Sequence, residues 1–139
     1  MNINILAVLI ATVLQFIIGF IWYGPLFGGL WGKIHGFDKL SKDVQQAMMK
    51  KMMPLYATQF LVTIVTTVVL GLMMGGLPSE WSTYGIAGFF WLGFVVPTQV
   101  SAVVFGGTDP KWIVKKIAIM AGASLLCLEV AAVVLRSIK

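Results

Sequence analysis

Four long apolar stretches dominate this sequence, at residues 3–23, 55–74, 82–105 and 113–135. A helix of about 20 residues spans the roughly 30 Å hydrocarbon core of a bilayer, and each stretch is about that length. Helices are expected because unpaired backbone groups are costly in hydrocarbon, and no stretch alternates in hydrophobicity every second residue as barrel strands do. The sequence therefore predicts an all-α polytopic membrane protein, a four-helix, up-down transmembrane bundle.

The composition excludes a soluble domain of ordinary kind. Of the 139 residues, 59% are apolar and only 11% are charged. A soluble domain of this length leaves a large share of its surface exposed and could not hide so much apolar surface from water. We therefore expect residues 1–139 to form a single transmembrane domain, with membrane lipids as its surroundings.

The basic residues predict how the spans are oriented. Eight lysines lie in the two connections that follow the first and third stretches: Lys33, Lys39, Lys42, Lys50, Lys51, Lys111, Lys115 and Lys116. The opposite side carries only Arg136 and Lys139. Because cytoplasmic loops are enriched in Lys and Arg, we expect both connections in the cytoplasm and both termini outside it. Anionic lipid accounts for the net charge of +5, so no nucleic-acid partner is expected.

The connection 24–54 is the part with most soluble character. Gly24 and Pro25 are expected to end the first span, because proline disfavours helix at the residue before it. Glycines then predict an irregular stretch: Gly28, Gly29, Gly32 and Gly36. Ser41 can cap a short helix that ends near Met53, with Pro54 in the first turn of the second span. This short helix either lies on the cytoplasmic membrane surface as an amphipathic helix or extends the second span.

A few polar residues lie inside the predicted spans. Glu129 is the only acidic one, and an intramembrane carboxylate is a candidate functional group. Its structural alternatives are a protonated side chain, a hydrogen bond to Asn4, or a position near Arg136. Gln15, Gln59 and Gln99 contribute one amide from each of the first three spans. They either line a polar pocket or join helices by hydrogen bonds, and the second is the more common role of such amides.

No constellation typical of an enzyme is found. His35 is the only histidine and Cys127 the only cysteine, so zinc, haem and disulfide chemistry lack the required ligands. Paired carboxylates, a nucleophilic triad and a phosphate-binding loop are also missing from the sequence. We expect no catalytic activity, no metal and no cofactor.

The run Trp22-Tyr23-Gly24-Pro25, followed by Trp31 and Gly36, resembles the opening of an uncharacterised prokaryotic membrane family, catalogued as domain of unknown function 1761. The later run Trp91-Leu92-Gly93-Phe94 is similar as well, and the resemblance covers nearly the whole chain. It implies four spans in a prokaryotic inner membrane and offers no catalytic residues. It also implies that Trp22, Tyr23, Gly24 and Pro25 belong to the signature of the family. In physical terms, the run can form a rigid interfacial turn that either packs or binds a lipid headgroup.

Two functions from different classes remain open at this point. The first is a structural or lipid-interacting membrane protein that forms homo-oligomers, because four short spans with many small residues leave faces suited to self-association. The second is a subunit of a small-solute or ion transporter or channel. In that case Gln15, Gln59, Gln99 and Glu129 would face one connected cavity. In the first case the amides would be paired inside the bundle.

Overall fold

The computed structural model describes residues 3–78 and 80–138, and four of its helices are long and apolar enough to cross a membrane. These candidate spans are Ile5–Leu26, Lys42–Gly76, Thr83–Phe105 and Pro110–Ser137. The α-helices within them are α1 (Ile5–Ile21), α3 (Lys42–Gly76), α4 (Thr83–Phe90), α5 (Val96–Phe105) and α6 (Ile113–Ser137). The all-α fold with four apolar helices of spanning length, expected from the sequence, is confirmed.

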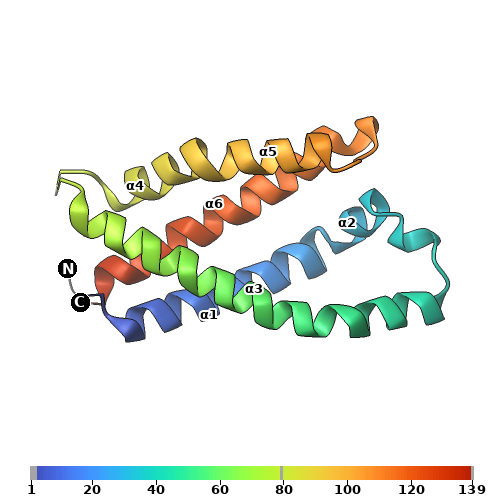
Figure 1. Ribbon diagram of the computed structural model, residues 1–139, viewed down its shortest axis with the longest axis horizontal. Coiled ribbons are helices and arrows are strands. Elements are labelled where there is room, and N and C mark those ends of the chain that lie inside the picture. Colours follow the sequence, from blue (N-terminus) through green and yellow to red (C-terminus); the bar gives the residue numbers. More distant parts are fainter. Residues whose placement is uncertain (1–2, 79, 139) are drawn as a thin grey trace.

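The four long helices run up and down, so that both chain ends lie at one end of the bundle (Figure 1). Short capping side chains begin three of the helices. Asn4 Oδ1 accepts hydrogen bonds from the backbone amides of Leu6 and Ala7 at the start of α1. Ser41 and Ser82 cap α3 and α4 in the same way. Such caps satisfy amides that have no partner inside the helix.

The core lies where α6 packs against α1, α3 and α4. Its buried members are mostly small or aliphatic: Ala11, Leu70, Ile86, Ala87, Leu128, Ala131 and Ala132. Alanines at these positions let the helix backbones approach closely, which is the usual basis of association between helices in lipid. Helix α6 is therefore the centre of the bundle.

The connection between the first two spans differs from the expectation at two points before Ser41. The first span does not end at Gly24-Pro25, because a π-helical segment, η1 (Trp22–Leu26), extends it. The glycine-rich stretch is not irregular: it forms α2 (Gly28–Ile34) and a 3-10 turn, η2 (Phe37–Lys39). Glycine permits irregular backbone without requiring it, and the edge-on and tilted contacts between the rings of Tyr23, Trp31 and His35 support a helix here.

The helix that begins after Ser41 extends the second span and is not a separate helix on the membrane surface. Residues Lys42–Gly76 form one helix of 35 residues, and no separate amphipathic helix precedes it within this described range. Pro54, expected in the first turn of the span, lies inside the helix instead. Proline leaves the carbonyl four residues earlier without its amide. That residue, Lys50, is exposed, so water or lipid headgroups can bond its carbonyl.

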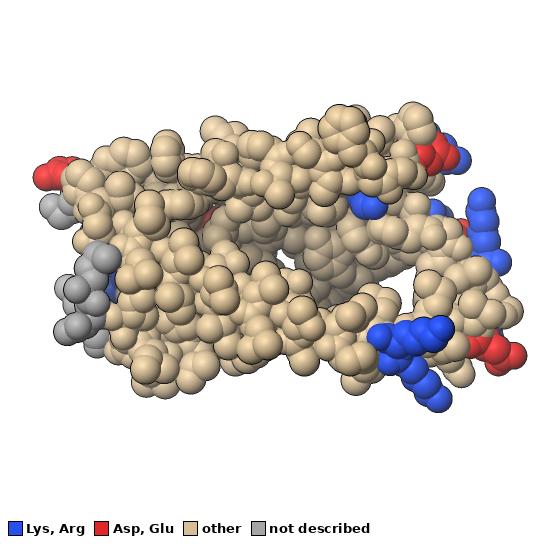
Figure 2. All heavy atoms as spheres, viewed as in Figure 1, with Lys and Arg blue, Asp and Glu red and all other residues tan. Residues whose placement is uncertain are grey.

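Charged side chains gather at the end of the bundle opposite the termini (Figure 2). This end carries α2, the start of α3 and the connection between α5 and α6 (Figure 1). The space-filling view also shows a hollow between α3 and the α4–α5 span on this face of the molecule (Figure 2). Most of the surface between the two ends is apolar, as lipid contact requires.

Candidate functional site

Two tryptophans from different spans bind the backbone of α6. Trp22 Nε1 donates to the carbonyl oxygen of Ile119 at 2.9 Å. Trp91 Nε1 donates to the carbonyl oxygen of Ala121 at 2.8 Å and lies 3.2 Å from Ser124 Oγ. These bonds join the first and third spans to the middle of α6. Trp91 is therefore a residue that packs one span against another.

Each of these tryptophans is the first residue of a π-helical segment, η1 for Trp22 and η3 (Trp91–Val95) for Trp91. A π-helical turn holds one more residue than an α-turn, and such turns are frequent at functional sites. The sequence reasoning missed both segments. The signal that could have found them is a proline inside or just after the segment, since Pro25 lies within η1 and Pro97 follows η3.

Gly122 makes room for the Trp22 ring. A β-carbon at this position would lie 2.8 Å from Trp22 Cζ2 and 3.2 Å from Cη2, closer than side chains pack. The indole and the glycine are therefore matched in shape. In the same region, a β-carbon on Gly28 would lie 2.8 Å from the Tyr23 carbonyl oxygen.

Gln15 joins the first two spans. Its Nε2 donates to Thr67 Oγ1 at 2.8 Å, and the side chain is buried. The Thr67 hydroxyl in turn donates to the carbonyl oxygen of Thr63. Cys127 of α6 reaches the Gln15 carbonyl oxygen at 3.7 Å. Gln15 therefore has the pairing expected of an amide that holds helices together.

The other two glutamines differ from each other. Gln99 contacts α6, with Nε2 3.5 Å from the Met120 carbonyl oxygen and Oε1 3.5 Å from Ser124 Oγ. Gln59 is exposed, and its side chain bonds only within its own helix, to Thr63 Oγ1 at 3.4 Å. Within the described chain, no hydrogen bond links the three glutamines to one another.

Glu129 has a buried oxygen, Oε2, without a hydrogen-bond partner among the described residues. Its Oε1 lies 3.9 Å from the place where a β-carbon on Gly88 of α4 would be. Asn4 is not a hydrogen-bond partner of Glu129 among the described residues, and its side-chain oxygen caps α1. No ion pair joins Glu129 to Arg136 in the part of the chain that the structure describes.

Glu129 also lies on a different face of α6 from the glutamine contacts. Successive residues of an α-helix are about 100° apart, so Glu129 is about 140° around the axis from Ser124, which Gln99 contacts. By the same geometry it is about 160° from Cys127, which contacts Gln15. Glu129 therefore lies on the other side of α6 from the contacts of Gln15 and Gln99, and the hydrogen bonds of the Gln59 side chain stay within α3.

Among the predicted interfacial residues, Trp22 packs on α6, and Tyr23 packs on Trp31. The Tyr23 and Trp31 rings lie 4.8 Å apart, and Lys116 Nζ lies 5.9 Å from the Trp31 ring. At the same end, Asp109 accepts from the Lys111 backbone amide at 3.1 Å. That hydrogen bond holds the pKa of the exposed Asp109 carboxyl below its usual range. Gly24 has open space around it, and Pro25 lies in η1.

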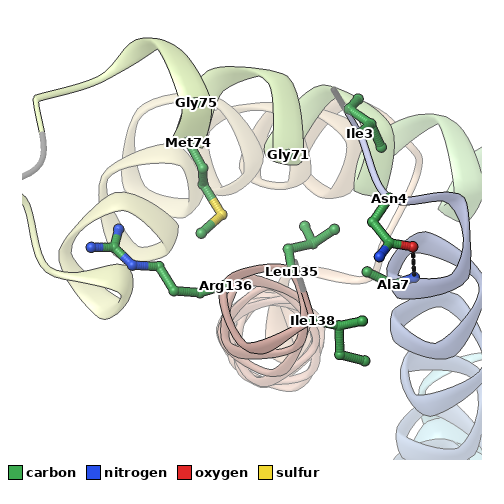
Figure 3. Close-up of a pocket in the computed structure, with 9 residues that line it drawn as sticks. All are labelled: Ile3, Asn4, Ala7, Gly71, Met74, Gly75, Leu135, Arg136 and Ile138. Atoms are coloured by element: carbon green, nitrogen blue, oxygen red, sulfur yellow. Dashed lines mark hydrogen bonds between the residues drawn. The ribbon is translucent and has the colours of Figure 1, made fainter. Parts of the chain in front are cut away.

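A pocket of about 310 Å³ opens at the end that carries the termini (Figure 3). It lies between the start of α1, the end of α3 and the end of α6. Its lining is Ile3, Asn4, Ala7, Gly71, Met74, Gly75, Leu135, Arg136 and Ile138. The sequence analysis named only Asn4 and Arg136 from this set, because the up-down topology places these three helix ends on one side of the membrane but does not show that they enclose a pocket.

Comparison with known proteins identifies one family. The family model described as "Protein of unknown function (DUF1761)" matches residues 6–136. No curated protein and no solved structure matches the chain.

Proposed function

Because the chain belongs to the DUF1761 family of unknown function, we propose a role from its own geometry: a non-catalytic, lipid-interacting membrane protein that self-associates through α3 and the α4–α5 span. It is an integral membrane protein with four apolar helices. The observation that carries the proposal is the uncovered pair of spans beside the hollow in Figure 2. The α3 and α4–α5 spans are buried to a smaller extent than α1 and α6.

The exposed side of these two spans is large and apolar. In α3, Leu61 is 64% exposed and Val65 is 62% exposed. In the α4–α5 span, Leu92 and Phe94 are similarly exposed. A second copy of the chain could fill the hollow by van der Waals packing, which drives association of helices in lipid. Acyl chains filling the hollow are the alternative that an experiment must distinguish.

The pairing of the polar groups supports a structural role. Gln15 and Gln99 each bond to a neighbouring helix, as amides that join helices do. In addition, the two tryptophans donate to carbonyls of α6. These contacts favour a rigid bundle that interacts with lipid or with a second copy through its outer, membrane-facing surface.

Oxidative cross-linking in membranes tests the self-association. In a Cys127→Ala background, single Val65→Cys and Leu92→Cys variants are oxidised with copper phenanthroline. The matched control is Ile17→Cys, an exposed position on α1. We expect disulfide-linked dimers for the first two variants and little for the control. Equal cross-linking at all three positions, or none, would contradict the proposed surface. Native mass spectrometry from mild detergent then reports the number of copies and any retained lipid.

A second candidate function rests on Glu129. Its buried, unpartnered oxygen is a feature of proton- or ion-coupled transport sites. In this alternative the chain is a subunit of a transporter or channel, with Glu129 exchanging a proton or cation. Ion or proton flux into proteoliposomes, lost in a folded Glu129→Gln variant, would favour this function over the structural one.

We also propose the prokaryotic inner membrane as the location, with both termini on the outer side. The lysine-rich end opposite the termini supports this orientation, because cytoplasmic segments are enriched in basic residues (Figure 2).

A further inference from the structure

The pocket at the terminal end of the bundle combines one cation with apolar walls. Arg136 is the only described Lys or Arg at this end, and it is exposed. Its guanidinium makes no hydrogen bond or ion pair with other described residues. A guanidinium is a fork of donors that matches the two oxygens of a phosphate. The side chain is therefore available for an anionic group at the membrane surface.

A second polar group lies on the other side of the pocket. Asn4 uses its Oδ1 to cap α1, which turns its amide nitrogen away from the helix amides. Figure 3 shows Asn4 and Arg136 on opposite sides, with Leu135 between them. The Asn4 Nδ2 has no hydrogen-bond partner within the described chain, so it can donate to a hydroxyl or ester oxygen.

The rest of the lining is apolar or small. Gly71 and Gly75 have no side chains, and the pocket lies beside them, along Met74 and Leu135. A volume of about 310 Å³ is at the lower end of the range for small-molecule sites, roughly 300–1,000 Å³. It fits a phosphate-containing headgroup and the start of an acyl chain, while the remaining chain would lie along the outside of α3 and α6.

We propose that this pocket binds one anionic glycerophospholipid, with its phosphate on Arg136 and its glycerol region near Asn4. This inference rests on the proposed lipid interaction and names the lipid class and the site. The pocket faces the same membrane surface as the termini, where the chain offers few other charges. Charge complementarity selects an anionic headgroup, and the apolar walls distinguish a lipid from free phosphate.

Native mass spectrometry of the full chain in mild detergent tests the site. Phosphatidylglycerol, phosphatidylcholine or inorganic phosphate is added in separate titrations. Wild type should retain phosphatidylglycerol in preference to the other two. Because one charge-assisted bidentate contact is lost, Arg136→Gln should weaken retention about tenfold, whereas Arg136→Lys should weaken it less. Lys42→Gln, which removes one charge at the other end of the bundle, should retain the lipid as wild type does.

A second variant guards against loss of folding in Arg136→Gln. Gly75→Leu fills the pocket without changing the charge and should also release the lipid. Retention unchanged in both variants, or binding of inorganic phosphate as strong as that of phosphatidylglycerol, would overturn the proposal. The dimer signal separates the two proposals: pocket variants should lose lipid and keep the cross-link at Val65→Cys. If the Val65→Cys variant forms no cross-link but the protein still retains the lipid, the proposed self-association is contradicted and the lipid site is not.

Discussion

At the scale of single residues, a few polar side chains join the other spans to α6. One of them, Trp22, fits against α6 only because residue 122 is glycine. The two indoles donate to carbonyls that already belong to a helix, so each bond adds a contact between spans without disturbing the α6 ladder. Such bonds are worth about 1 kcal/mol in lipid. Their value lies in fixing where the first and third spans sit along α6.

Gly122→Ala should destabilise the protein by about 1–3 kcal/mol, since the added methyl must displace the Trp22 ring. Gly19→Ala is the matched control: it lies in α1 with nothing within 4 Å of its β-carbon position. It should be neutral or slightly stabilising, because alanine favours helix. Unfolding in mixed detergent micelles, followed by circular dichroism, measures both. Equal stability of the two variants would show that the indole does not pack on Gly122.

Gln15 and Thr67 should be energetically coupled. A double-mutant cycle with Gln15→Leu and Thr67→Val should give a coupling of about 0.6–1.7 kcal/mol, because the two side chains share a buried interhelical hydrogen bond. The same unfolding assay measures it. Gln15→Leu paired with Gln59→Leu is the control and should show additive effects, because no hydrogen bond links these two side chains and Gln59 bonds within its own helix. Additivity in the first pair would remove Gln15 from the contacts between helices.

At the scale of elements, the apolar runs predicted the four spans, and the departures have local causes. Hydropathy reports what lipid can cover, so it located the membrane part of α3 but not the 12 residues between Lys42 and Met53 that continue it outward. Proline preferences pointed to breaks at Pro25 and Pro54. In the structure, neither proline ends the helix: Pro25 lies in a π-helical segment, and Pro54 lies inside the exposed part of α3. Pairings such as Gln15 with Thr67 depend on helix rotation, which the sequence alone did not determine.

The continuity of α3 predicts a distance that spectroscopy can measure. Spin labels at Lys42→Cys and Phe60→Cys, in a Cys127→Ala background, are 18 residues apart, so an unbroken helix separates their backbones by about 27 Å. Double electron–electron resonance in lipid nanodiscs reports this distance. A pair at Phe60→Cys and Val69→Cys, inside the span, serves as reference at about 14 Å. A markedly shorter first distance would mean that the helix breaks at Pro54 and folds onto the membrane surface.

At the scale of the whole molecule, charge and apolar surface divide between the ends and the middle (Figure 2). Eight lysines lie at the end that carries the connections after the first and third spans, and the other end has Arg136 beside the pocket. This asymmetry supports one orientation in the membrane. The bundle has its hollow along the side and its small pocket at one end, so a protein partner and a lipid would occupy different places.

The proposed orientation is tested by labelling in intact cells. A Lys42→Cys variant should react with a membrane-impermeant maleimide only after the cells are opened, because this end is proposed to be cytoplasmic. A Glu80→Cys variant, at the turn between the second and third spans, should react in intact cells. Cys127→Ala provides the background in both cases. The reverse pattern would invert the protein in the membrane and place the pocket in the inner leaflet.

The length of α3 sets a relation between this protein and the thickness of its bilayer. At about 1.5 Å per residue, its 35 residues extend about 52 Å, well beyond a hydrocarbon core of about 30 Å. Tilting hides part of this excess, and the lysines near residue 50 can reach the headgroups while the methionines beside them stay in the acyl region. Thin and thick membranes should therefore favour different tilts of α3, and the width of the opening beside it would change with the lipid composition of the cell.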